Sequence, residues 1–380
     1  MTTPAELYKN AIDLNRFSNS VARRIARTYN DLIVDAVERL AAAGTGATAT
    51  QTARFGAILA QLKTSLEGWA GTATALSVEE LQGLVELQAG FVTEILNGEL
   101  PDDSLLQVRS VQISPQFAQA VATIDPTTYN VVTLSDDLGA AVTGTPRPFR
   151  LEIGDGTTIT LPNGATLQSS FRRLAGKQAE VFTKEVRNGL LLGESSDKIA
   201  RRLRRQLIAV PNNQIKAMVR TSVNQVANAA SQAVYSQNQE ITKRYRYIAT
   251  LDSRTSAICR ALDGRTFKYN EGPTPPQHFN CRSTTVPVVD YKGLGIPPPR
   301  PGKRRSSGGL VPANQTYGQW LFDQSKEVKA DVLGAKQVPY FNMLSRKYGP
   351  SVAIRKFVTA DGTEVTLQEL RRRYPEVKRS

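Results

Sequence analysis

Apolar residues recur every three or four positions through the first hundred residues, which is the spacing of one buried helix face. The pattern predicts helices over 4–42, 51–70 and 77–98. The third is expected to start at Ser77, because Glu80 follows it at capping-box spacing. Residues 1–98 are therefore predicted to form a helical hairpin or a small bundle. We expect its long amphipathic helices to be a protein–protein module, with burial of Leu7, Phe17 and Ile25 inside the bundle as the alternative.

The helical period is lost between residues 101 and 164. Strand-like runs occur at 129–134, 149–153 and 157–161, and Gly154-Asp155-Gly156 between the last two is typical of a hairpin turn. The sequence predicts an irregular insertion that contains a β-hairpin.

Helical spacing returns near residue 165 and continues to 191. A new helix is expected to begin with Ser196 as its cap and to break at Pro211, and another follows over 212–238. Alternating residues then predict strands at 245–251, 265–268 and 283–289.

The last ninety residues divide in two. Residues 291–309 are rich in Pro, Gly, Ser and basic side chains, which predicts an extended linker. Residues 310–380 form a basic C-terminal extension with a helix expected at 367–374. The predicted fold class is α+β, with mainly helical regions at 1–100 and from 165, and a small β-rich Cys/His-containing unit near 246–290.

Composition narrows the class of protein. No apolar run approaches the roughly 20 residues needed to cross a bilayer, and we expect no secretory signal at the start of the chain. The sequence has two cysteines and one histidine, so a disulfide scaffold and a His-rich metal centre are excluded.

The charge is unevenly distributed along the chain. Residues 1–169 contain 11 Lys/Arg and 18 Asp/Glu, a net charge of −7, whereas residues 170–380 contain 37 and 16, a net charge of +21. A strongly basic half indicates a polyanionic partner, most often nucleic acid, or a solvated surface that maintains solubility.

Both cysteines and the histidine fall within one short segment. Cys259, His278 and Cys281 could supply three ligands to zinc, with Asp252 or Asp263 as the fourth. Because a structural zinc site usually has four N/S ligands, we expect instead no cofactor, and buried thiols with a histidine that fixes a turn. A metal-dependent nuclease is a further alternative, but no second histidine or acidic ligand cluster accompanies the segment.

The segment resembles the signature of the phage head morphogenesis family, minor head proteins similar to protein F of phage Mu. The matching residues are Asp252, Arg254, Thr255, Cys259, Leu262, Gly264, Pro275, Pro276, His278, Cys281 and Arg282. Ser256 and Ser283 stand where relatives often have cysteine, and Arg220-Thr221 resembles a further family motif. The resemblance covers 165–290.

The resemblance implies a structural virion protein rather than an enzyme. It would be made in the host cytoplasm and placed inside the capsid near the portal, with the portal protein, the major capsid protein and packaged double-stranded DNA as expected partners. The alternative is a nucleic-acid-processing enzyme with a Cys/His metal site.

Three basic clusters are the predicted DNA contacts. Because no aromatic residues interleave them, we expect contact with backbone phosphate without sequence preference. The predicted residues are Arg201, Arg202, Arg204, Arg205, Lys303, Arg304, Arg305, Arg371, Arg372 and Arg373.

Overall fold

The computed structural model describes residues 3–44, 49–101, 106–109, 166–269, 271–300, 302–359 and 362–376. The predicted strands at 129–134, 149–153 and 157–161 lie outside these ranges. Mainly helical regions accompany a small antiparallel sheet, so the predicted α+β class is confirmed. No helix among the described residues is both long enough and apolar enough to span a membrane.

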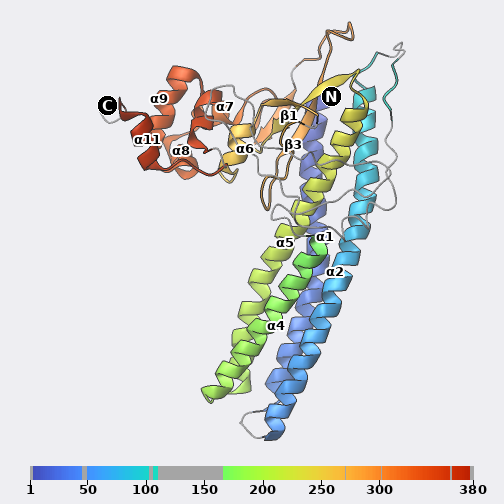
Figure 1. The fold of residues 1–380 in the computed structure, drawn as a ribbon, viewed down its shortest axis with the longest axis vertical. Helices are drawn as coiled ribbons and strands as arrows, with labels where there is room; N and C mark the ends of the chain where they lie inside the picture. Colours follow the sequence, from blue (N-terminus) through green and yellow to red (C-terminus); the bar gives the residue numbers. More distant parts are fainter. Residues whose placement is uncertain are drawn as a thin grey trace.

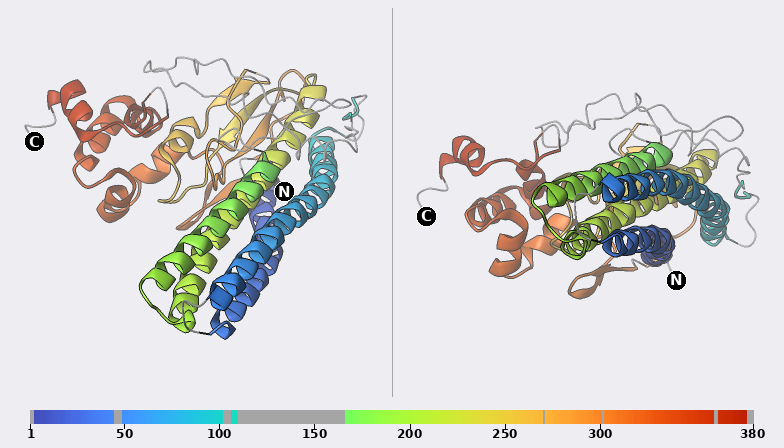
Figure 2. Two further views of the ribbon diagram at one scale, coloured as in Figure 1. Left: turned by 60° about the horizontal axis from the view of Figure 1, so that its bottom comes forward. Right: turned by 90° about the horizontal axis from the view of Figure 1, so that it is seen from below.

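Four long helices lie side by side as an elongated bundle (Figures 1 and 2). They are α1 (Thr3–Ala42), α2 (Ala49–Asn97), α4 (Leu167–Leu191) and α5 (Ser196–Gln237). The small sheet lies at one end of the bundle, and the C-terminal helices lie beside the sheet, away from the bundle axis.

A single apolar core runs through all four helices. The Trp69 ring of α2 lies 5.1 Å from the Tyr29 ring of α1 and 5.7 Å from the Phe171 ring of α4, measured between centroids. Leu7 and Ile25 are 3% and 1% exposed. The apolar face of α1 is therefore core, which removes the reason for assigning it to a partner protein, and the segments 1–100 and 165–237 pack as one unit.

The prediction of a helix start at Ser77 is wrong, because α2 continues through this position. The Ser77 hydroxyl donates to the carbonyl oxygen of Ala73 at 2.7 Å, and Thr74 does the same to Ala70. Hydroxyl side chains can make this bond within a helix, so the spacing from Ser77 to Glu80 does not by itself mark a start.

The predicted break at Pro211 is also wrong, since α5 contains this proline in its interior. Proline has no N–H to donate to the carbonyl of residue 207. That Leu207 carbonyl instead accepts a hydrogen bond of 2.9 Å from the Tyr29 hydroxyl of α1. The helix begins one residue earlier than expected: Ser195 is the cap, and the Ser196 hydroxyl donates to the Gly44 carbonyl.

We expect Tyr29→Phe to lower the free energy of unfolding by about 1–3 kcal/mol, the cost of an unsatisfied buried carbonyl. In a Pro211→Ala background the restored N–H can bond to Leu207, so the same change should cost clearly less. Urea unfolding of the four proteins measures this coupling. Equal costs in both backgrounds would contradict the assigned role of Tyr29.

The predicted strands near 245, 265 and 283 are confirmed. They form an antiparallel sheet in the order β2-β1-β3, from β1 (Thr242–Ile248), β2 (Thr266–Lys268) and β3 (Thr284–Val289). Tyr245 of β1 pairs with Phe267 on one side and Pro287 on the other. Its ring packs in a core with Val92 of α2 and Val234 of α5, which fixes the sheet on the end of the bundle.

The prediction of an extended linker does not hold for residues 303–309. Strands β4 (Lys303–Ser306) and β5 (Gly309–Pro312) form a hairpin. Arg304 is 3% exposed in this hairpin, whereas Lys303 and Arg305 point to solvent. One of the basic residues of this segment, Arg304, is therefore buried, and its ion pair with Asp263 holds the hairpin in place.

The C-terminal extension has its own apolar core, built around Trp320, Phe341 and Phe357. Its helices are α7 (Tyr317–Phe322), α8 (Lys326–Leu333), α9 (Val338–Tyr348), α10 (Pro350–Ala353), the 3₁₀ turn η2 (Ile354–Phe357) and α11 (Leu367–Arg373). Helix α11 confirms the helix predicted at 367–374.

Candidate functional site

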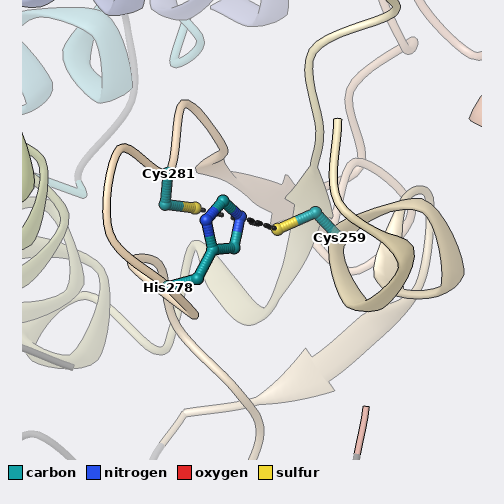
Figure 3. A group of neighbouring side chains, drawn as sticks. All are labelled: Cys259, His278 and Cys281. Atoms are coloured by element: carbon teal, nitrogen blue, oxygen red, sulfur yellow. Dashed lines mark hydrogen bonds between the residues drawn. The ribbon is translucent and has the colours of Figure 1, made fainter. Parts of the chain in front are cut away.

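Cys259, His278 and Cys281 meet between the sheet and the C-terminal extension (Figure 3). Cys259 lies on the short helix α6 (Ala257–Leu262), and the other two lie in the loop that precedes β3. The Cys259 Sγ is 3.4 Å from His278 Nε2 and 3.7 Å from Cys281 Sγ. Both cysteines are 1% exposed. The structure thus brings together the three residues that the sequence singled out.

The histidine-bearing loop is held in place by backbone contacts. The Cys281 N–H donates to the His278 carbonyl at 3.1 Å, and Asn280 has a φ of 60°. The His278 Nδ1 lies 2.8 Å from the Phe279 carbonyl, so Nδ1 carries the proton and Nε2 faces the Cys259 sulfur. Pro275 and Pro276, joined by a cis peptide bond, enter this turn.

The loop also makes hydrogen bonds to helix α5, through the Arg220-Thr221 motif. The Asn280 N–H donates to Thr221 Oγ1 at 3.0 Å, and Arg220 donates to Asn280 Oδ1 at 3.1 Å. Further along α5, the Asn228 side chain accepts from the Thr285 N–H of β3 at 3.1 Å. The sequence marks Arg220-Thr221 as a motif but gives no role for it, and these contacts supply one. The asparagines on this face of α5 were missed, although polar residues in a small-residue helix were a visible signal.

The two thiols of the cluster differ in acidity. Burial raises the pKa of Cys259, and its bond with Cys281 raises it further. Burial also opposes ionisation of Cys281, but hydrogen bonds from Cys259 and His278 outweigh this and hold its pKa well below the ordinary value. Burial disfavours the charged imidazole, yet the contact with Cys281 raises the pKa of His278. The two shifts are mutual, because the contact between these side chains favours the charged form of each.

Neither proposed fourth ligand belongs to this cluster. Within the described ranges, the only grouping of His, Cys, Asp or Glu suited to a metal is Cys259, His278 and Cys281. Asp252 forms a two-armed ion pair with Arg282, with N–O distances of 2.5 and 2.8 Å. Although burial opposes its ionisation, the hydrogen bond from Arg282 lowers the pKa of Asp252. Both carboxylate oxygens of Asp252 therefore bond to Arg282, in the loop before β3, and not to the cluster.

Asp263 is buried in a different network. Its carboxylate accepts from the backbone N–H groups of Ala249 and Tyr317, both at 2.6 Å, and from Arg304 at 3.1 and 3.2 Å. Arg304 also donates to the Ala249 carbonyl. The charged pair therefore connects β1, α6, the hairpin and the C-terminal extension, and it has no free position for a metal.

The remaining motif residues shape the turns around α6. Thr255 Oγ1 donates to the Thr250 carbonyl at 2.6 Å. Gly264 has a φ of +79°, which favours glycine, and its N–H donates to the Tyr247 carbonyl at 2.8 Å. Arg254 is exposed, with its guanidinium 3.8 Å from Asp252. These hydrogen bonds hold the turns on either side of α6.

The predicted DNA-contact residues fall into two groups. Arg202 is paired with Glu185 and Glu194 at 2.6 Å, and Arg372 and Arg373 are paired with Glu369 at 2.6 and 2.7 Å. Arg304 is buried, so a phosphate cannot reach it, and its prediction as a DNA contact is wrong. The exposed members, with no ion pair to a described residue, are Arg201, Arg205, Lys303, Arg305 and Arg371, and Arg204 lies 3.5 Å from Glu38.

A basic cavity of about 250 Å³ lies between α1, α5 and the hairpin. Arg220, Arg282 and Arg305 line it, and the Arg220 Nε is buried without a hydrogen-bond partner among the described residues. Burial, together with the nearby charges of Arg282 and Arg254, lowers the pKa of Arg220. This cavity could not be predicted from the sequence, because its arginines come from segments far apart in the chain.

The comparisons with known proteins address this same region. Residues 180–286, which run from within α4 through α5, β1, β2 and the cluster to the first residues of β3, match the family described as Phage Mu protein F like protein. This region is phage Mu F-like. No curated protein and no solved structure matched the chain. The Mu F-like match confirms the resemblance drawn from the motif, and it suggests a phage head morphogenesis protein.

The Mu F-like region ends at the first residues of β3, so the Cys/His cluster lies wholly inside it. The hairpin and the C-terminal helices lie outside it, although Arg304 and Tyr317 complete the network around Asp263. The family is one of structural phage head proteins, which suggests a non-enzymatic role and a place in the virion.

Proposed function

We propose that this chain is a structural minor head protein of a tailed bacteriophage, located inside the capsid near the portal and acting in head assembly. The observation that carries the proposal is the Mu F-like match over 180–286. The elongated bundle provides a long outer surface for contact with the portal protein or the major capsid protein. The network of ion pairs around the cluster supports a structural function for the region.

We further propose that the basic half of the chain contacts packaged double-stranded DNA, in support of genome packaging or delivery. The net charge of +21 over 170–380 supports this, because binding to phosphates requires cations and no particular fold. The candidate contacts are now the exposed Arg201, Arg205, Lys303, Arg305 and Arg371. They lie on different parts of the molecule, since α5 begins at the end of the bundle opposite the sheet (Figure 1).

A mass-spectrometric inventory of mature particles and empty proheads tests the location. We expect the protein in both, at low copy number relative to the major capsid protein. Crosslinking within proheads should then connect it to the portal protein. Its absence from both kinds of particle would overturn the proposal, and crosslinks to the major capsid protein alone would overturn the portal location.

The DNA contact has a separate test. For the full chain, the logarithm of the binding constant should fall linearly with the logarithm of salt concentration. Replacing Arg201, Arg205, Lys303 and Arg305 with glutamine should reduce the slope by about one for each phosphate that is no longer neutralised. A variant with Lys326, Lys329, Lys336 and Lys347 replaced is the control for total charge. An equal reduction in both variants would show a diffuse charge effect and contradict the proposed DNA-binding residues.

A further inference from the structure

Two separations within the Cys259, His278 and Cys281 cluster match those of a tetrahedral metal site. With bonds to zinc of about 2.3 Å from sulfur and about 2.0–2.1 Å from nitrogen, two sulfur ligands lie about 3.8 Å apart, and a sulfur and a nitrogen about 3.5 Å apart. The observed separations are 3.7 Å between the sulfurs and 3.4 Å between Cys259 Sγ and His278 Nε2. We propose that these three side chains bind a zinc ion that fastens α6 to the loop before β3.

The orientation of His278 supports this assignment. A metal-binding histidine usually donates its other ring N–H to a carbonyl or a carboxylate, which fixes the tautomer. Here Nδ1 faces the Phe279 carbonyl at 2.8 Å and Nε2 faces the Cys259 sulfur at 3.4 Å. The loop contacts of Asn280 with Thr221 and Arg220 hold the ring in this position before any ion binds.

The charges of the site also fit a divalent cation. Two thiolates balance the charge of Zn²⁺, so the buried site needs no carboxylate ligand. Asp252 and Asp263, the two acids first considered as a fourth ligand, are ion-paired with Arg282 and Arg304. The count of three N/S ligands had favoured a metal-free cluster, but their convergence within 4.8 Å favours a bound ion.

Ser256 identifies the fourth position. It occupies the N-cap of α6, yet its side chain makes no capping bond, and its buried Oγ has no hydrogen-bond partner among the described residues. Ser256 stands three residues before Cys259, at the start of the same short helix. We assign the fourth ligand to a water or hydroxyl at Ser256, completing a site of two sulfurs, one nitrogen and one oxygen.

The first test measures metal in the full-length protein as purified from zinc-supplemented cells. We expect one zinc per chain, and replacement by Co²⁺ should give the intense visible bands of a tetrahedral ion with thiolate ligands. Cys281→Ser should lose both. Folded wild-type protein that contains no zinc and gives no such spectrum with Co²⁺ would overturn the proposal, as would zinc retained in full by Cys281→Ser.

The second test does not depend on a variant that loses stability. Ser256→Cys supplies a third thiolate, so its zinc affinity in a chelator competition should rise at least about tenfold over wild type. Its Co²⁺ spectrum should gain sulfur-to-metal charge-transfer intensity. Ser253→Cys, in the preceding turn, is the matched control and should change neither. Equal behaviour of the two variants would overturn the assignment of the fourth position.

Discussion

Replacing Arg304 with glutamine is expected to lower the free energy of unfolding by about 3–5 kcal/mol, the cost of removing one partner from a buried ion pair. The side chains of Arg304 and Asp263 are 3% and 0% exposed, so water cannot replace the missing guanidinium. The Asp263 carboxylate would keep its two backbone N–H donors but lose its counter-charge.

The control for this prediction is the neighbouring residue in the same strand. Arg305→Gln changes the net charge by the same amount, but this side chain is exposed and should alter stability by less than about 0.5 kcal/mol. The midpoint of urea unfolding for both variants measures the difference. Similar midpoints would mean that the pair around Asp263 contributes little to the fold.

Trp320→Ala should cost about 3–5 kcal/mol, the loss typical of a large buried aromatic side chain. Trp320 is 1% exposed, and its ring centroid lies 5.1 Å from that of Tyr317. Because the C-terminal helices have a core separate from that of the bundle, the loss should be local. Hydrogen exchange should increase across α7–α11 while α1 and α5 keep their protection.

Leu310→Ala is the corresponding control, since this side chain is 63% exposed in β5 of the same C-terminal region. We expect its exchange pattern to match that of wild type. Exchange that increases equally in α1 and α7 after Trp320→Ala would show that the bundle and the extension unfold together, contrary to the two-core description.

Local periodicity predicted most of the elements, because each long helix and each strand of the sheet shows its buried face directly in the sequence. The errors arose where a distant residue changes the meaning of a local signal. From local sequence alone, Pro211 predicts the end of a helix. The helix continues because the Tyr29 hydroxyl, from another helix, donates to the Leu207 carbonyl that Pro211 leaves without a partner. From local sequence alone, Arg304 predicts a solvated charge, but in the structure it is buried in an ion pair with Asp263.

The candidate site was found from its rare residues, but its chemistry was not. The sequence identified Cys259, His278 and Cys281, and it offered Asp252 or Asp263 as a fourth ligand. Spacing along the chain cannot show that both acids face arginines, or that the Ser256 hydroxyl is buried without a partner among the described residues. The two acid–arginine pairs join residues that are 30 and 41 positions apart in the chain.

The buried charges of the Mu F-like region have consequences for the order of events during synthesis. The Arg260 guanidinium, on a side chain 7% exposed, donates to the Val332 carbonyl and to Glu364. The Asp263 carboxylate requires Arg304 and the Tyr317 N–H. A ribosome-bound chain that ends soon after residue 290 has all of the Mu F-like sequence but none of these partners. The region around α6 can therefore complete these pairs only after the C-terminal helices have emerged from the ribosome. Nascent chains stalled before Glu364 emerges should be more protease-sensitive around α6 than the released full-length protein.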